Sequence, residues 1–336
     1  MEEINKILEK LLEQCKLGNM KGMPVRVSGG LLNRMYKVIT DNGIYAIKLL
    51  NPEVMKREHA KDNHIFAETI SNIAKDNGVS CLPAKIINNA VLQLVEGYYF
   101  LIFDWFEGKS IEDEELTLDK VSKVAKELVK IHNINFKGQK DKCKAYYENN
   151  IIDWNFYIDK IENKELIKLL FDNMKRLNEL DIVALDSLNY ISKNMVISHR
   201  DLDLPNILWD KSDNPIIIDW ESTGLINPSM EVIDTAWNWS GGQNYFDKEK
   251  YQLFVKTYKE NGGNLDEYNE ALKAVFKAKF GWLEYNLKRV CGIECIDEEE
   301  RKLGESEVKR TISEINKFDM CKSDMRIQDV KNNYLV

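Results

Sequence analysis

The sequence predicts an α+β fold with two lobes, and a change of pattern along the chain indicates it. In the first 108 residues, short runs alternate with the two-residue period of strands around one main helix, whereas most later segments have the 3.6-residue period of amphipathic helices. Between residues 195 and 221, polar side chains stand at the ends of short apolar runs and interrupt the helical part. We therefore expect an N-terminal lobe over 1–108 and a mainly helical C-terminal lobe over 109–336.

The N-terminal lobe is expected to contain a five-stranded antiparallel sheet. Asp41-Asn42-Gly43 is typical of the turn of a hairpin, and Asn51-Pro52-Glu53 is typical of a helix start. We expect an amphipathic helix over 2–18 and a second helix over 51–76 that a break can interrupt. The expected strands are 24–27, 36–40, 44–50, 84–87 and 98–103, with 91–95 in the segment that joins the last two.

The C-terminal lobe is expected to be mostly helical around the 195–221 segment. Apolar residues recur at helical spacing in most of its segments, and residues 137–150 have no clear period and are expected to form a loop. The expected helices are 116–132, 151–163, 164–177, 181–194, 229–240, 247–261, 265–292 and 304–317.

The composition of the chain indicates the compartment in which the protein is expected. No run of residues approaches the roughly 18 apolar positions of a membrane-spanning helix, and the first residues are charged and amphipathic, unlike a secretory signal. The six cysteines are scattered, so we expect reduced thiols and a cytoplasmic protein. Cys291 and Cys295 have helical spacing, but the four histidines lie far from them in sequence, and we expect no metal site there.

The net charge of the chain indicates which classes of binding partner to expect. The formal net charge is −8, whereas a protein that binds nucleic acid normally carries a basic face. We therefore expect no nucleic-acid partner and no membrane partner. The acidic balance is compatible with a small cationic substrate.

The residues with the clearest chemical meaning lie between 196 and 221. One apolar run leads into His199-Arg200-Asp201, Asn206 begins a second run, and a third run ends on Asp219. This gives two carboxylates and one amide at the ends of short strands. Such a set suits phosphoryl transfer, because Asp201 can accept a hydroxyl proton while Asn206 and Asp219 offer the hard oxygen ligands that Mg²⁺ prefers. The alternative is a polar hairpin whose side chains only cap turns, and the agreement of spacing and flanking strands disfavours it.

Three further positions fit the binding of a nucleotide. Ser28-Gly29-Gly30 lies between two expected strands, where backbone N–H groups can surround phosphates, although a plain hairpin turn explains it as well. Lys48 stands within an apolar strand and points either to solvent or into a cleft. A glutamate on the following helix can pair with it, and we favour Glu68 over Glu58 because Glu68 lies among apolar residues.

In this order, these residues resemble those of protein-kinase-like phosphotransferases, and more closely those of the aminoglycoside phosphotransferase and choline kinase group. The resemblance covers residues 25 to about 240 and is most specific over His199-Arg200-Asp201-Leu202-Asp203-Leu204-Pro205-Asn206 and Asp219. It implies a bilobal protein-kinase-like fold, with ATP or GTP and Mg²⁺ as cofactors. It also implies that the base of the nucleotide contacts the backbone from Asp104 to Phe106, with Phe103 behind it.

Two departures from protein kinases favour a small acceptor. Asp219 is followed by Trp220-Glu221 instead of Phe-Gly, and the short segment from 219 to 234 contains no Ala-Pro-Glu. No room therefore remains for an activation segment that docks protein substrates. Arg200 also departs from the group, in which the loop often reads His-Gly-Asp.

The leading hypothesis is a small-molecule kinase with Asp201 as its catalytic base. Asp203, Glu221 and Glu284 are candidates for attracting a cationic acceptor such as an aminoglycoside, and Trp237, like Trp154 and Trp239, is a candidate for stacking on it. We expect structural roles for His199, which would hold the catalytic loop, and for Asp234, which would anchor it. The alternative from another class is a catalytically silent kinase-fold protein that binds or supports a partner.

Overall fold

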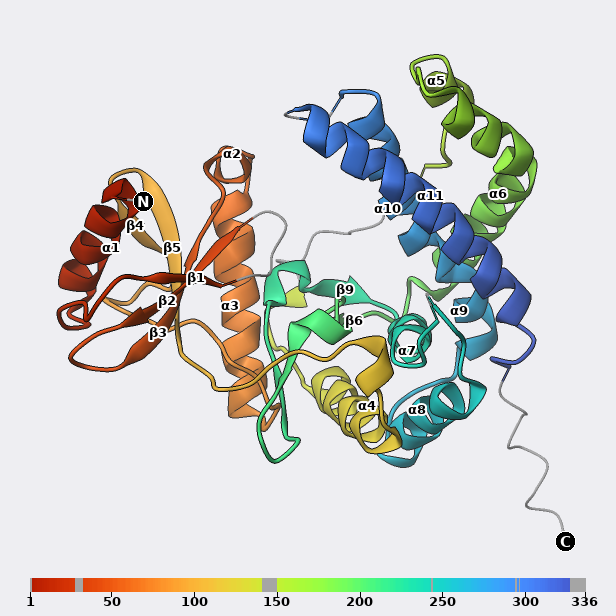
Figure 1. Ribbon diagram of the computed structural model, residues 1–336. Helices are drawn as coiled ribbons and strands as arrows, with labels where there is room; N and C mark the ends of the chain where they lie inside the picture. The colour runs from red at the N-terminus through yellow and green to blue at the C-terminus, as the bar shows by residue number, and fades with distance from the viewer. Residues whose placement is uncertain are drawn as a thin grey trace, which may run out of the picture. The chain divides into compact units, whose positions relative to one another are not determined.

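The chain divides into two units, and each is described by itself. The computed structural model describes residues 2–27, 33–140, 150–242, 244–293, 295 and 297–326. The first unit combines Met1–Glu112, Asn133–Lys142 and His199–Thr223, and the second combines Asp113–His132, Cys143–Ser198 and Gly224–Val336 (Figure 1). We assigned 199–223 to the C-terminal lobe, but this segment packs within the first unit. The boundary at residue 108 stays a prediction.

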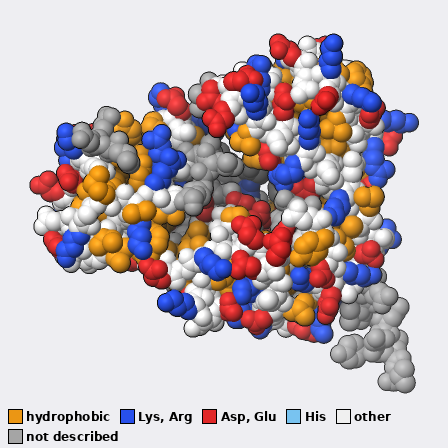
Figure 2. Space-filling model, in the orientation of Figure 1, with side chains coloured by type: hydrophobic (Ala, Val, Ile, Leu, Met, Phe, Trp, Pro, Cys, Tyr) orange, Lys and Arg blue, Asp and Glu red, His pale blue; other side chains and the backbone are white. Residues whose placement is uncertain are grey.

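Charged side chains of both signs cover the surface. On the face shown in Figure 2, Lys and Arg side chains are interspersed with Asp and Glu. Among the helices in the described ranges, none combines the length and the apolar composition that crossing a membrane requires.

The first unit is built on the predicted five-stranded antiparallel sheet. Its strands are β1 (Val25–Val27), β2 (Arg34–Ile39), β3 (Ile44–Leu49), β4 (Gln93–Val95) and β5 (Tyr98–Asp104). They lie in the order β1-β2-β3-β5-β4, and all neighbours are antiparallel. The turn at 41–43 joins β2 to β3 as expected, and the register pairs Ile39 with Ile44. β3 is therefore the central strand.

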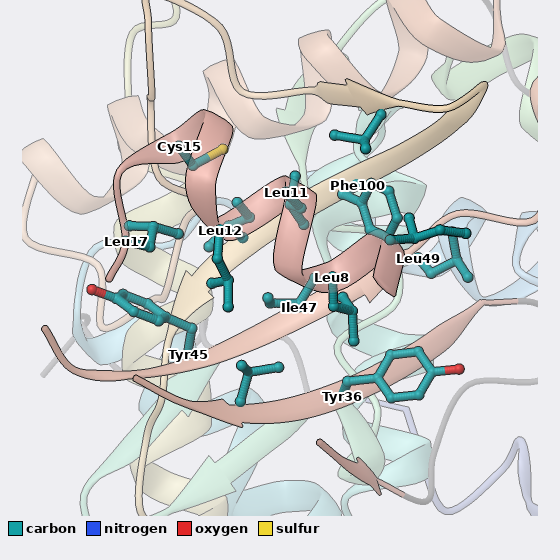
Figure 3. Close-up of a cluster of buried hydrophobic side chains, with 14 residues drawn as sticks. Leu8, Leu11, Leu12, Cys15, Leu17, Tyr36, Tyr45, Ile47, Leu49 and Phe100 are labelled. Carbon is teal, nitrogen blue, oxygen red and sulfur yellow. The ribbon is translucent and has the colours of Figure 1, made fainter. Parts of the chain in front are cut away.

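Helix α1 (Glu2–Cys15) covers one face of this sheet. Its apolar stripe, which includes Leu8, Leu11 and Leu12, packs against strand residues that include Ile47 and Phe100 (Figure 3). Alternating side chains of a strand point to opposite faces. Since Ile47 and Leu49 belong to the α1 cluster, Lys48 between them points to the other face.

Helix α3 (Ala60–Asp76) lies on the opposite side of the sheet from α1 (Figure 1). The predicted helix over 51–76 is interrupted, as we allowed. A short helix, α2 (Pro52–Met55), begins at the N-cap Asn51, and His59 has a left-handed backbone with φ of 67°. The buried side of α3 carries two ionisable side chains, His64 and Glu68, in addition to Ser71 and apolar residues. These two side chains therefore lie on the same side of the sheet as Lys48.

The predicted strand over 84–87 is wrong, and the fourth strand is β4, within the segment that we expected only to join two strands. The N–H of Lys85 donates to the carbonyl of Ile102, at 2.7 Å, but the N–H of Ala84 donates to the side chain of Glu68. Ile87 then enters a tight turn with Ala90. Only the N–H of Lys85 thus bonds to a neighbouring strand, β5, while Ala84 and Ile87 bond to a side chain and to a turn residue, so no continuous ladder forms over 84–87.

The segment 199–223 is attached to the first unit through a short hairpin. Strand β7 (Ile207–Trp209) pairs with β8 (Pro215–Ile217). The N–H of Ile217 donates to Ser80 O at 2.8 Å, and the N–H of Leu82 donates to Ile217 O at 3.0 Å. Because residues 80–82 directly follow α3, these bonds place the end of β8, and with it Asp219, beside α3.

The second unit is mainly helical, as predicted. It also contains strands β6 (Val196–Ser198) and β9 (Gly224–Ile226), of which β9 was not predicted. Its helices are α4 (Leu118–Asn133), α5 (Trp154–Ile158), α6 (Lys164–Ile191), α7 (Pro228–Asn238), α8 (Lys248–Glu260), α9 (Tyr268–Ala274), α10 (Phe276–Val290) and α11 (Glu298–Cys321).

The division of the second unit into helices differs from the prediction at two places. The helices expected at 164–177 and 181–194 are one continuous helix, α6, since Asn178-Glu179-Leu180 between them contains no glycine or proline. Conversely, the helix expected over 265–292 is divided into α9 and α10 at Val275. In addition, α5 is shorter than the expected 151–163 and α11 is longer than the expected 304–317. The loop expected at 137–150 lies mostly outside the described residues.

Candidate active site

The loop that carries Asp201 is held by His199. The imidazole is fully buried, and its Nε2–H donates to the carbonyl of Ile218 at 3.0 Å. Its Nδ1 accepts the N–H of Asp201 at 3.3 Å. The ring also packs edge-on against Trp220, with ring centroids 4.9 Å apart. His199 therefore connects the Asp201 loop to the segment that carries Asp219, as we expected of a structural histidine.

Asp201 and Asn206 are in direct contact. Asn206 Nδ2 donates to the backbone carbonyl of Asp201 at 2.8 Å and to its Oδ2 at 3.0 Å. The carbonyl of Asn206 accepts the N–H of Ile218 at 3.0 Å, which brings it next to Asp219. Among the described residues, nothing donates to Asn206 Oδ1. The amide nitrogen thus orients the Asp201 carboxylate, while the amide oxygen remains available as a ligand.

Two residues of this segment have left-handed backbones. Arg200 has φ of 66° and Asp219 has φ of 60°. This conformation costs a residue with a side chain about 1–2 kcal/mol and suits glycine. The strain explains why a His-Gly-Asp loop is the easier solution at position 200.

Lys48 reaches Asp219 from the sheet. Its Nζ lies 3.1 Å from Asp219 Oδ1 and is also ion-paired with Glu221. Burial acts to lower the pKa of Lys48, but attraction to Glu221 and Asp219 outweighs it and raises the pKa to about 12. Burial acts to raise the pKa of Asp219, but Lys48 reverses this and holds it below its usual range. Lys48 is therefore a buried cation that faces two carboxylates.

Glu68 is close to this group but has a different partner from the one that we expected. Its Oε2 accepts the N–H of Ala84 at 2.6 Å, and no ion pair joins it to Lys48 within the described residues. Burial raises the pKa of Glu68 to about 7, although the Ala84 N–H and Lys48 act to lower it. Glu58, the other candidate, is exposed and lies 3.0 Å from His59 Nε2. The expected Lys48–Glu68 pair is thus not formed here.

The segment after β5 leaves the backbone N–H of Phe106 available. Asp104 ends the strand and pairs with Lys85 at 2.8 Å, and the N–H of Trp105 donates to Ile44 O. The N–H of Phe106 donates to no acceptor among the described residues. A side chain at Gly108 would stand 2.8 Å from the carbonyl oxygen of Trp209, so the close approach of the two backbones requires glycine.

The remaining predicted residues are not all brought to this site. Ser28, Gly29 and Gly30 lie outside the described residues. Asp203 is half-buried in the loop after Asp201, and Glu221, predicted to attract the acceptor, lies on Lys48 instead.

The candidates in the second unit have other surroundings. The prediction that Trp237 stacks on the acceptor is wrong. Its ring is fully buried and stacked on Phe246, with ring centroids 5.5 Å apart, so neither face is open to a substrate. Trp154 and Trp239 are buried as well. Glu284 accepts from Tyr157 OH at 2.9 Å, and Asp234 pairs with Lys279.

Two residues of the site were missed in the sequence. Asn33 donates its side-chain amide to Glu221, at 3.1 and 3.2 Å to the two carboxylate oxygens. His64 is buried on α3 one turn before Glu68; burial lowers its pKa, and Glu221 and Lys48 both act on it electrostatically. The four-residue spacing between His64 and Glu68 was the signal available for the histidine. For Asn33, only its position between the glycine segment and β2 indicated a role.

Within the described ranges, no three His, Cys, Asp or Glu residues gather as a metal site on their own. Asn206 and Asp219 offer two oxygen-bearing side chains, and the backbone of Asn206 bonds to Ile218, which precedes Asp219. Mg²⁺ is usually bound by one or two protein oxygens plus phosphates and water, so a complete protein cage is not required.

A comparison with protein families identifies the chain. The model of the phosphotransferase enzyme family, APH, matches residues 25–267. The chain belongs to this family. The predicted resemblance is confirmed, and the protein is a phosphotransferase. A comparison with curated proteins found no significant match.

Solved structures confirm the fold of the phosphotransferase. A spectinomycin phosphotransferase in complex with ADP and spectinomycin has a TM-score of 0.69 at 14% identity, with 95% of this chain and 98% of that chain covered. A choline/ethanolamine kinase family protein from Mesorhizobium loti has a TM-score of 0.62 at 15% identity, with 98% and 100% covered. An aminoglycoside phosphotransferase from Alicyclobacillus acidocaldarius has a TM-score of 0.62 at 12% identity, with 94% of each chain covered. The predicted α+β, protein-kinase-like fold is confirmed.

Proposed function

We propose that this phosphotransferase transfers the γ-phosphoryl group of ATP or GTP to a hydroxyl of a small, cationic acceptor such as an aminoglycoside. The observation that carries the proposal is the contact between Lys48 and Asp219, next to the contact between Asp201 and Asn206. A buried cation for phosphates, a carboxylate for a hydroxyl proton and two oxygen ligands thus lie in one unit. The names of the similar structures, which include ADP, spectinomycin, choline and ethanolamine, support a nucleotide and a small acceptor.

The proposed role of Asp201 is to orient the acceptor hydroxyl and take up its proton. Its carboxylate is held by Asn206 Nδ2, which fixes the direction in which it can accept. Proton transfer by a positioned side chain contributes about 10²–10⁴-fold to a rate. In this proposal His199 keeps the loop in place and takes no part in the chemistry.

Asn206 and Asp219 are the residues that would hold Mg²⁺. They fit a hard cation because Asn206 Oδ1 receives no donor among the described residues, and the Asp219 side chain is 36% exposed despite its pairing with Lys48. When bound, Mg²⁺ supplies positive charge to the phosphate oxygens. Lys48 supplies the protein's own positive charge to the phosphates, and the free N–H of Phe106 fits the expected contact of the backbone with the purine.

The acceptor side of the site is proposed from fewer observations. Asp203 and Glu284 remain the candidates for attracting a cationic acceptor, whereas the burial of Trp237 removes it. Glu221 is better placed to act on Lys48 than on the acceptor.

The test is nucleotide-dependent phosphorylation of a panel of aminoglycosides, choline-like alcohols and sugars, with ATP and with GTP. We expect Asp201→Asn to lower kcat by about 10²–10⁴-fold while the nucleotide and Mg²⁺ still raise the melting temperature. The matched control is Asp213→Asn, in the exposed turn between β7 and β8, where asparagine tolerates the left-handed backbone. Turnover by Asp201→Asn at the rate of the control would contradict the proposed base.

The same preparation tests the alternatives. A catalytically silent protein would show no phosphorylated product with any acceptor and no melting shift with ATP or GTP. A protein kinase would label generic protein substrates from labelled ATP in preference to the small-molecule panel. Either result would replace the proposed function.

A further inference from the structure

Asn33 connects three segments of the first unit that lie far apart in sequence. It directly precedes β2. Its Nδ2 donates to both carboxylate oxygens of Glu221, 188 positions away, at 3.1 and 3.2 Å. Its Oδ1 accepts the N–H of Asn51 at 2.9 Å. Asn51 in turn caps α2 by accepting the N–H of Glu53 at 2.9 Å. Both ends of the Asn33 amide are therefore used.

Glu221 is the second member of this arrangement. Its carboxylate receives the Asn33 amide on one side and the ammonium of Lys48 on the other. The Glu221 side chain is 29% exposed, whereas that of Lys48 is 9% exposed, so the pair is largely shielded from water. Lys48 stands on β3, which ends two residues before Asn51. Asn33 thus bonds to the residue that pairs with Lys48 and to the chain that follows the strand of Lys48.

The Lys48 side chain needs such support. A lysine has four rotatable carbon bonds, so it holds one position only where its partners fix it. Glu68, which we expected to do this, bonds to the N–H of Ala84 instead. The partners that remain are Asp219, which is also a proposed Mg²⁺ ligand, and Glu221. Of these two carboxylates, Glu221 is the one held by a neutral amide.

We propose that Asn33 is a positioning residue for the phosphate-binding lysine: it fixes the Glu221 carboxylate, and Glu221 fixes Lys48. The inference rests on the proposed function for its kinetic consequence, since Lys48 is taken to bind the nucleotide phosphates. Asn33 acts through other side chains and touches no reacting atom in this scheme. Replacement of Asn33 should therefore raise the KM for nucleotide and leave the KM for acceptor unchanged.

An exchange of the amide and the carboxylate tests this directly. Asn33→Asp keeps an acceptor for the Asn51 N–H but places a second carboxylate against Glu221. Glu221→Gln supplies an amide donor at position 221. In the double variant Asn33→Asp with Glu221→Gln, the amide of residue 221 can therefore donate to the carboxylate of residue 33, which is the reverse of the wild-type bond. The control is Asn264→Asp, an exposed position whose side chain only accepts the N–H of Asp266, which aspartate also does.

We expect Asn33→Asp to raise the KM for nucleotide by about tenfold or more, with the KM for acceptor within about twofold, because a hydrogen bond to a charged group is lost. Asn264→Asp should equal the wild type. The double variant restores a bond between positions 33 and 221 but loses the carboxylate that pairs with Lys48, so it is read by stability and not by KM. An unchanged nucleotide KM in Asn33→Asp would overturn the inference.

Unfolding by urea separates this inference from the proposed function. If the two side chains are coupled, Asn33→Asp and Glu221→Gln together should cost less stability than the sum of the two single changes, with no ligand present. A wild-type protein without nucleotide turnover would contradict the proposed function, and this cycle would then decide the inference alone. Additive costs would overturn it.

Discussion

Lys48 and Asp219 are 171 positions apart in sequence, yet Lys48 Nζ lies 3.1 Å from Asp219 Oδ1. Two local facts produce this contact. Lys48 is on the central strand and faces away from α1, and β8 is hydrogen-bonded to Ser80 and Leu82, a few residues after the end of α3. The contact joins the lysine that we propose to bind phosphates to a proposed magnesium ligand.

Replacement of Lys48 should weaken nucleotide binding specifically. Lys48→Met removes the ammonium but keeps most of the apolar stem. We expect the dissociation constant for ATP or GTP with Mg²⁺ to rise by about 10–100-fold, because a charge-assisted bond to phosphate is lost. Calorimetric titration measures this. Lys10→Met is the control, since Lys10 is an exposed residue of α1 that pairs with Glu96; equal affinities of the two variants would contradict the assignment.

The raised pKa of Glu68 predicts a pH dependence of stability. Since burial raises its pKa from 4.5 to about 7, the folded protein keeps a proton that the unfolded chain releases between these values. The free energy of unfolding should therefore fall as pH rises from about 4.5 to 7, by up to about 3 kcal/mol from this residue. Glu68→Gln keeps the acceptor for Ala84 and should remove this part of the slope in urea unfolding.

The control for that measurement is Glu58→Gln. Its carboxylate is exposed near the start of α3, so the slope should match that of the wild type. A slope in Glu68→Gln equal to that of Glu58→Gln would show that Glu68 does not retain a proton in the folded protein.

The left-handed backbone of Arg200 predicts an unusual order of stabilities. Arg200→Gly and Arg200→Ala both remove the side chain, but only alanine keeps the strain of φ at 66°. We expect the glycine variant to be more stable by about 0.5–1 kcal/mol in urea unfolding. At Lys126, on the exposed side of α4, the same pair of changes should give the opposite order, with alanine more stable by about 1 kcal/mol. The same order at both positions would argue against the left-handed conformation.

A buried ion pair in the second unit predicts a large loss of stability. Lys279 Nζ lies 2.6 Å from Glu314 and 3.1 Å from Asp234, and these carboxylates raise its pKa despite burial. Lys279→Met removes the buried cation from Glu314, which keeps only the half-exposed Arg310 at 3.6 Å. It should cost about 3 kcal/mol in the free energy of unfolding at neutral pH.

The control for this loss is Lys273→Met. Lys273 pairs with Glu270 at 2.8 Å, but the two side chains are 45% and 37% exposed, so the expected cost is at most about 1 kcal/mol. Similar losses in the two variants would contradict the role given to burial. The loss in Lys279→Met should also shrink at acid pH, where Glu314 takes up a proton.

Much of the fold could be predicted from the sequence because most of its helices and turns depend on local sequence patterns. The hairpin at 41–43 and the helix start at Asn51-Pro52 depend on residues that are neighbours in sequence. The strand at 84–87 was misplaced for the opposite reason. Its N–H groups are divided between Ile102 and the side chain of Glu68, and no local pattern reports such distant partners.

The sequence by itself determined the family chemistry of this phosphotransferase, because Asp201, Asn206 and Asp219 stand at fixed spacings around short strands. Only the tertiary structure decided which carboxylate faces Lys48. Glu221 and Asp219 do so, while Glu68 bonds to Ala84, and Asn33 fixes Glu221. The physical reason is that ion pairs between distant segments depend on how β3, α3 and the 199–223 segment pack, and side-chain spacing along the chain does not contain that packing.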